Sequence, residues 1–176
     1  NKKTSKLKSS TSLCALVLSG LVTITSSSFA VDVLITDDAA IQSNTPTTSY
    51  GTGGSIYSYH NGGNGFYYKS WIKLDASSLP TLVAGDTKLS LTAANSNAGY
   101  TIDFYLLEGI DDSLWSEGTV TWDNAPGNDT SGAGFTSGAS ATLLGSFTTF
   151  SFVADTTYDL AFTGAAETSL LSALNT

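Results

Sequence analysis

Aromatic rings and lysines alternate along one stretch of the sequence, and both residue types can bind sugars. If residues 66–74 form a single strand, Tyr67, Lys69, Trp71 and Lys73 point toward the same face of it. On an exposed sheet, flat rings suit the apolar C–H face of a sugar ring, while lysine can hydrogen-bond hydroxyl groups or attract a uronate. The alternative is that both faces of this strand are buried, with Trp71 in the core.

Two tyrosines just before this stretch would enlarge the aromatic surface. Tyr57 and Tyr59 precede a turn rich in glycine and asparagine, residues 60–65, so we expect them one hairpin away from the strand at 66–74. The arrangement depends on register, because a slip of one residue turns every ring to the opposite face. The sequence therefore predicts a sugar-binding platform on a sheet.

Acidic residues at the ends of expected strands suggest a second kind of site. Asp37 and Asp38 close the first expected strand, and Asp111 and Asp112 follow a later one. Loop carboxylates are the oxygen ligands that calcium prefers, although none of these pairs has the spacing of a helix–loop–helix calcium loop. The sequence predicts either a structural calcium ion held by these acids or a surface on which they are simply solvated.

Residues that usually carry out catalysis are scarce. His60 is the only histidine and lies in the expected turn, without the glycine–serine–glycine elbow of hydrolases. Asp103, Glu108 and Glu117 could supply the two acids of a glycosidase or lyase, but a chain with 15 acids is expected to bring some pair within reach by chance. We therefore expect a protein that is not an enzyme.

Length and charge point to one domain that does not bind polyanions. The chain has 176 residues, enough for a single domain with a core. Beyond residue 30, three lysines stand against 15 acidic residues, a net charge of −12. Nucleic acids and anionic membrane surfaces require a cluster of cationic side chains, which three scattered lysines cannot supply.

Residues 1–30 have the pattern of a secretory signal peptide. Lysines at positions 2, 3, 6 and 8 precede an apolar run at 13–24, and small residues at 28 and 30 suit a signal peptidase. The run is shorter than the roughly 20 residues that span a bilayer. We expect cleavage after Ala30, a mature domain over 31–176 without the only cysteine, Cys14, and a secreted or cell-surface location.

Short strands separated by turns must position these residues. Ile102, Phe104 and Leu106 alternate with polar neighbours at a period of two, the pattern of a half-buried strand. We expect strands over 32–36, 55–59, 66–74, 88–93, 101–106, 118–122, 142–153 and 157–162. Leu170, Leu171 and Leu174 share one side of an expected helix over 165–174, and the glycine, serine and threonine content of 124–140 predicts a loop. This organisation favours an all-β fold, an antiparallel jelly-roll β-sandwich with one short C-terminal helix.

Several segments together resemble the DNRLRE domain family, which is catalogued with carbohydrate-binding module family 96. They are 38–41, 44–51, 72–80, 88–91 and, most specifically, 115–126, which reads Trp-Ser-Glu-Gly-Thr-Val-Thr-Trp-Asp-Asn-Ala-Pro. The similarity extends over about residues 35–175 and is to the bacterial secreted and surface-anchored branch. It implies a jelly-roll domain that binds alginate or related glycans, and one further C-terminal strand that this chain lacks.

The most specific of these segments contains a group that we interpret as structural. Two indoles would fill one end of the sandwich, while polar side chains satisfy loop amides. Contact with a ligand is the alternative role. The group is Trp115, Glu117, Trp122, Asn124 and Pro126.

The function expected from all these features is a secreted, non-catalytic module that binds polysaccharide through exposed aromatic rings. Members of the family commonly carry arginine on the strand corresponding to 66–74, and this chain has none there, so an acidic glycan is a poorer fit. The alternative is a subunit of an extracellular surface layer, matrix or filament that self-assembles by strand addition.

Overall fold

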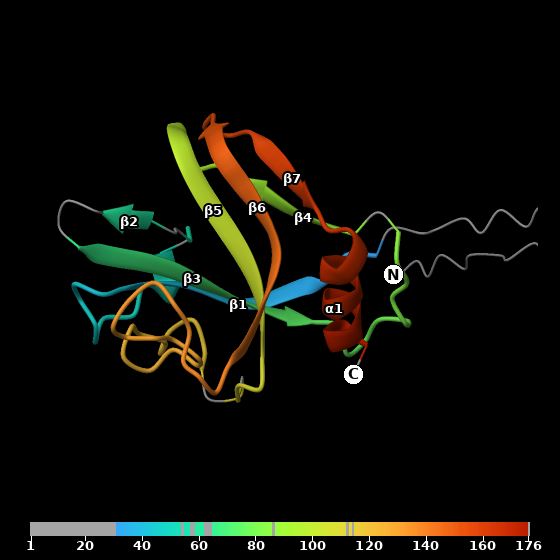
Figure 1. The fold of residues 1–176 in the computed structure, drawn as a ribbon, viewed down its shortest axis with the longest axis horizontal. Helices are drawn as coiled ribbons and strands as arrows, with labels where there is room; N and C mark the ends of the chain where they lie inside the picture. The colour runs from blue at the N-terminus through green and yellow to red at the C-terminus, as the bar shows by residue number, and fades with distance from the viewer. Residues whose placement is uncertain are drawn as a thin grey trace, which may run out of the picture.

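The computed structural model describes residues 31–175, apart from 54, 57–58, 62–64, 86, 112 and 114. The expected signal peptide, Tyr57 and Asp112 therefore lie outside the described residues, as do the side chains of Tyr59 and His60. The elements are β1 (Leu34–Gln42), the 3-10 helix η1 (Gly51–Gly53), β2 (Tyr59–Asn61), β3 (Phe66–Asp75), β4 (Lys88–Thr92), β5 (Asn97–Glu108), β6 (Ser140–Phe152), β7 (Thr157–Ala161) and α1 (Gly164–Leu174) (Figure 1).

Antiparallel pairing joins these strands into three small sheets. β3 pairs with β1 on one side and with β2 on the other, β4 pairs with β7, and β5 pairs with β6. The expectation of an all-β, antiparallel fold with one short C-terminal helix is therefore confirmed. The described sheets have three, two and two strands, and the jelly-roll sandwich stays a prediction.

Residues 118–122 form a turn instead of the expected strand. Thr119 and Val120 both donate their backbone N–H groups to Ser116 O, at 3.0 Å. Val120 and Trp122 are both buried, so the segment has the alternation of a strand although its backbone turns. The Thr119 hydroxyl also accepts the backbone N–H of Ser116 at 3.2 Å. The prediction fails because such local side-chain hydrogen bonds compete with a sheet ladder.

Hydrophobic clusters lie on both sides of the β5–β6 pair. Phe104 and Leu106 of β5 join Phe147 of β6 in a cluster with side chains of β4, β7 and α1. Leu107, on the opposite face of β5, packs instead against a cluster of buried tryptophans that involves β1 and β3. Figure 1 shows the long β5–β6 ribbon between the β1–β3 sheet and the part of the molecule that contains β4, β7 and α1. The period of two in β5 therefore contributes side chains to both clusters.

Two polar side chains fasten α1 to the segment before β4. Glu167, which is buried, accepts hydrogen bonds from Gly85 N at 2.9 Å and from Thr87 Oγ1 at 2.7 Å. These bonds hold the pKa of its carboxyl below the usual value. Asn175 bonds both backbone groups of Leu82, its Oδ1 accepting at 2.7 Å and its Nδ2 donating at 2.9 Å. In the described part of the chain, no helix is both long and apolar enough to cross a bilayer.

Candidate functional site

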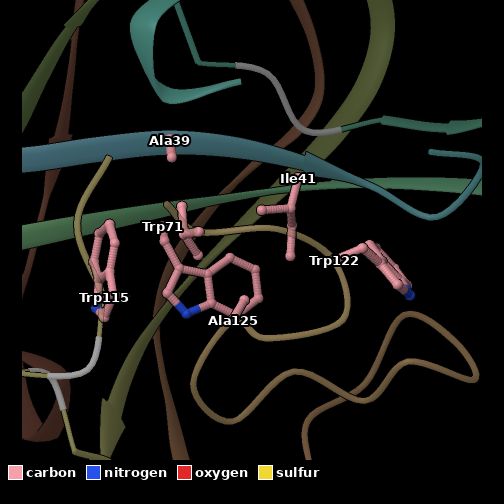
Figure 2. Packing of buried hydrophobic residues seen from close by; sticks show 7 residues of the cluster. Ala39, Ile41, Trp71, Trp115, Trp122 and Ala125 are labelled. Atoms are coloured by element: carbon pink, nitrogen blue, oxygen red, sulfur yellow. The ribbon is translucent and has the colours of Figure 1, made fainter. Parts of the chain in front are cut away.

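The aromatic face expected on β3 is turned toward the protein interior. Trp71 is only 6% exposed, and its Nε1 donates a hydrogen bond to Pro126 O at 3.1 Å. The prediction that this ring lies on an open surface is therefore wrong, and Trp71 belongs to the core. The buried residues around it form the tryptophan cluster, which consists of Ala39, Ile41, Trp71, Trp115, Val120, Trp122 and Ala125 (Figure 2).

A long loop, residues 115–136, covers this face of β3. Trp122 from the loop stacks on Tyr67 of β3, with ring centroids 6.3 Å apart and an interplanar angle of 20°. Figure 2 shows the indoles of Trp71, Trp115 and Trp122 on the same side of the β1 and β3 ribbons, with the loop passing close to them. Alternation along a strand does not say which of its two faces another segment will cover, and this is why the expected exposure of β3 is wrong.

Lys69, on the same face of β3, holds the loop in place. Its Nζ donates to Asn128 Oδ1 at 2.6 Å and to Gly134 O at 2.8 Å, and lies 4.6 Å from the centroid of the Trp122 ring. Burial lowers the pKa of Lys69 to about 8, and the charge of nearby Asp129 offsets part of that effect. The Lys69 amino group is therefore committed to the protein rather than presented to a sugar.

Lys73 and Asp37 form a second attachment between the sheet and the loop. Lys73 Nζ donates to Trp115 O at 3.1 Å, lies 5.0 Å from the centroid of that indole, and is 3.8 Å from Asp37 Oδ2. Asp37 Oδ1 also accepts the backbone N–H of Glu117 at 3.1 Å. The ion pair is partly exposed, so its main consequence is geometric: it fixes the start of the loop against β1 and β3.

The other acids expected to hold calcium are placed separately. Asp38 is half-buried on β1. Asp111 Oδ1 accepts hydrogen bonds from the backbone and the hydroxyl of Ser113, at 3.1 and 2.5 Å. Within the described ranges, no group of three or more His, Cys, Asp and Glu side chains could hold a metal ion. The calcium site stays a prediction.

The segment 115–126 folds against residues 44–51, so two of the segments that carry the family resemblance meet. Ser49 Oγ donates to Glu117 O at 2.9 Å. Gly51 is buried beside the same carbonyl, and a Cβ added there would lie 1.8 Å from Glu117 O. Position 51 therefore requires glycine, because the backbone of the loop occupies the place of a side chain.

The group interpreted as structural has these positions in the loop. Trp115 and Trp122 are buried. Asn124 bonds two backbone groups of the turn, accepting from one N–H at 2.6 Å and donating to one carbonyl at 3.1 Å. The carbonyl of Pro126 accepts the indole N–H of Trp71, and Glu117 contacts its surroundings through its backbone. Each of these contacts ties the loop to itself, to the sheet or to the segment 44–51.

An open groove of about 290 Å³ lies near the end of β5 and the start of β6. Its walls come from the segments 109–111, 124–127 and 136–139, and its polar side chains are those of Asp111, Asn124 and Thr136. Several glycines line it, and they leave room because they carry no side chain. A shallow, open shape of this kind suits a polymer that passes through rather than a small molecule that is enclosed.

An aromatic pair lies close to this groove, and one of its rings is exposed while the other is half-buried. Tyr105 is 41% exposed and meets Phe135 edge to face, with ring centroids 5.2 Å apart and an interplanar angle of 65°. Thr136, which follows Phe135, lines the groove and donates its backbone N–H to Gly127 O at 2.9 Å. Leu143, paired with Tyr105 across the β5–β6 ladder, is 49% exposed. We call these residues and the adjoining groove the Tyr105 surface.

The Tyr105 surface combines the two kinds of group that recognise sugars. The ring of Tyr105 and the side chain of Leu143 are apolar and accessible. The Tyr105 hydroxyl makes no hydrogen bond to any described residue, so it remains free to bond a ligand. Exposed Thr136 and Asp111 add a hydroxyl and a carboxylate at the groove.

Comparison with known families identifies the class of protein. The profile of carbohydrate-binding module family 96 matches residues 30–157, more than half of the chain. The chain belongs to carbohydrate-binding module family 96. The resemblance to this family is thereby confirmed, while the assignment to its bacterial secreted branch stays a prediction. The class of a carbohydrate-binding module fits the expectation of a non-enzyme. No curated protein matches the sequence.

The family 96 module carries two candidate residues that sequence reasoning did not select. Tyr105 belongs to the polar half of the alternation at 101–106, which already placed it on the less buried face. Phe135 is the lone aromatic residue of the loop expected at 124–140. Both signals were present in the sequence, but the contact between these two distant positions was not.

Proposed function

We propose that this chain is an exported, non-catalytic module that binds polysaccharide at the Tyr105 surface. The match of residues 30–157 to a carbohydrate-binding family carries the proposal, because it names the class of ligand. The same match favours binding over the alternative of a self-assembling surface subunit. Export is supported by the signal-peptide pattern of residues 1–30, and the jelly-roll arrangement implied by the family resemblance belongs to the same proposal.

Stacking on Tyr105 supplies most of the binding in this proposal. A sugar ring lays its C–H face on the exposed phenol, beside the apolar side chains of Phe135 and Leu143. Hydroxyl groups of the same or the next sugar then bond the Tyr105 hydroxyl, Thr136 and Asp111. Because the groove is open and one ring dominates the contact, the affinity of a single site is weak.

The test is affinity electrophoresis of the purified chain in gels that contain soluble polysaccharides. We expect retardation in at least one gel, and an affinity about tenfold lower for Tyr105→Ala, since a stacked ring contributes about 1 to 1.5 kcal/mol. Tyr105→Phe keeps the ring and retains most of the affinity. Val153→Ala, a truncation of a side chain that is 57% exposed outside this surface, leaves it unchanged.

Two results would contradict the proposal in different ways. Full retardation of a folded Tyr105→Ala variant would place the binding site elsewhere on the molecule. Unretarded migration of the wild-type chain in every polysaccharide gel would contradict carbohydrate binding itself. Thermal melts of each variant serve as the control for folding.

A further inference from the structure

We infer that the Tyr105 surface takes an uncharged glycan and rejects polyuronates. The inference rests on the proposed function and narrows its class of ligand. It is drawn from the charges that the fold places around the exposed ring and from the partners that the lysines already have.

Carboxylates surround the Tyr105 surface. Asp111 lines the groove. Asp103 lies two residues before Tyr105 on the same face of β5 and is exposed. Asp129 lies near the other aromatic ring, since its backbone N–H donates to Gly134 O at 3.3 Å, in the residue just before Phe135. These groups can accept hydrogen bonds from sugar hydroxyls, but they repel a ligand that itself carries carboxylates.

Lys69 is the cation that lies beside Phe135 and Asp129, and its donors are used. Its Nζ lies 5.9 Å from the centroid of the Phe135 ring. An ammonium group has three N–H donors, and three acceptors surround this one: Asn128 Oδ1 at 2.6 Å, Gly134 O at 2.8 Å and Asp129 O at 3.3 Å. A uronate would have to displace one of the bonds that hold the loop on β3. The lowered pKa of Lys69, about 8, is consistent with an amino group that is half-buried.

The other two lysines of the described residues are committed elsewhere. Lys73 bonds the loop carbonyl of Trp115 and faces Asp37. Lys88 Nζ lies 2.6 Å from Asp159 Oδ2 on the β4–β7 pair. Residues 31–176 have a net charge of −12 and contain no arginine, so the long-range field also opposes a polyanion. A neutral glycan carries no net charge, so this field does not repel it.

A matched pair of polymers isolates the charge of the ligand. Homogalacturonan and its fully methyl-esterified form share one backbone, as do alginate and carboxyl-reduced alginate. Affinity electrophoresis would compare both pairs, together with uncharged glucans, xylans and mannans, at low and high salt in EDTA and again with calcium. We expect each uncharged form that binds to do so at least about tenfold more tightly than its acidic counterpart at low salt, with the gap narrowing as salt screens the repulsion.

The outcomes separate this inference from the proposed function. Retention by any uncharged polysaccharide, with weaker or no retention by the polyuronates, supports both. Tighter binding of a polyuronate in EDTA would overturn the inference and leave carbohydrate binding intact. Retention of a polyuronate that requires calcium would also overturn it, because a bridging cation would then supply the missing positive charge. Failure to bind any polymer in the panel would overturn the proposed function.

A charge placed beside the ring provides the complementary test. Leu143→Lys introduces an ammonium group at a position that is paired with Tyr105 and already exposed. We expect this variant to bind the polyuronates at least about tenfold more tightly than the wild-type chain at low salt. Leu143→Gln is the neutral control, and an equal gain in that variant would overturn the role assigned to charge.

Discussion

Replacing Gly51 with alanine tests whether the contact between the two loop segments holds this fold together. A Cβ at position 51 would lie 1.8 Å from Glu117 O and 2.3 Å from its carbonyl carbon. Both are backbone atoms, so no side-chain rotation can relieve the clash. One of the two segments must move by more than about 1 Å to restore an ordinary contact in a close-packed interior.

The movement has an energetic cost that can be worked out from the contacts on Glu117. Overpacking of this kind costs about 1 to 3 kcal/mol. The hydrogen bonds from Ser49 Oγ to Glu117 O and from Glu117 N to Asp37 Oδ1 would be stretched or lost, at about 1 kcal/mol each. Alanine restricts the unfolded chain and returns about 0.4 to 1 kcal/mol. The free energy of unfolding should therefore fall by about 2 to 4 kcal/mol.

Gly53→Ala is the matched control for this variant. Gly53 lies in the same 3-10 helix, and a Cβ added there would meet nothing within 4 Å. Only the effect on the unfolded chain applies, so we expect stability equal to the wild type or higher by up to about 1 kcal/mol.

Urea denaturation followed by tryptophan fluorescence measures both variants, because the buried indoles of the tryptophan cluster lie beside the affected loop. A Gly51→Ala variant within about 0.5 kcal/mol of the wild type, which is the range of neutral surface changes, would contradict the steric role assigned to this contact. So would equal destabilisation by Gly53→Ala.

Three further predictions concern stability. Lys69 has a pKa of about 8 in the folded protein against 10.5 ordinarily, so between these pH values the unfolded chain is protonated at Lys69 and the folded chain is not. The stability of the wild type relative to Lys69→Met should therefore rise with pH from about 8 to 10.5. The exposed ion-pair variant Lys88→Met, melted in parallel, should show no such rise. Glu167 has a folded pKa below 4.5, so its contribution to stability is complete above that pH and is lost as the pH falls through the folded pKa. In an acid titration followed by circular dichroism, Glu167→Gln should lose stability less steeply than the wild type. Thr149 adopts φ 48° although it is β-branched, so Thr149→Gly should raise the free energy of unfolding by about 0.5 to 1 kcal/mol. Thr148→Gly, the control, should lower it. A lower free energy of unfolding in both variants would contradict strain at position 149.

Local patterns predicted the elements of the described fold where apolar residues recur at the period of a strand or of a helix. The period of two through Phe104 and Leu106 lies within β5, and the leucine spacing near the C-terminus gave a helix over 165–174 that the structure places at Gly164–Leu174. The same reasoning failed at 118–122, because hydrogen bonds to Ser116 O bend a segment whose side chains still alternate between buried and exposed. Period alone does not distinguish a strand from a turn that folds over a core.

Sequence patterns also predicted some features of the candidate site and missed others. Trp71 and Lys69 were identified as a chemically notable pair, and the structure finds them together on one face of β3, but that face lies under the loop. The exposed ring is that of Tyr105 in β5, and it meets the half-buried ring of Phe135 from a distant loop. Their contact depends on where the loop crosses the sheet, and the spacing of residues in the sequence does not predict this position.

The all-β class, most strand positions and the carbohydrate-binding family could be predicted before folding was considered, because alternation, turn residues and motifs are properties of neighbouring residues. Three features depend on long-range packing: which face of β3 is covered, why position 51 requires glycine, and which aromatic ring faces solvent. The physical reason is that both faces of a strand carry side chains that can be buried. The segment that covers one of them, residues 115–136, reaches it only after the chain has folded back on itself.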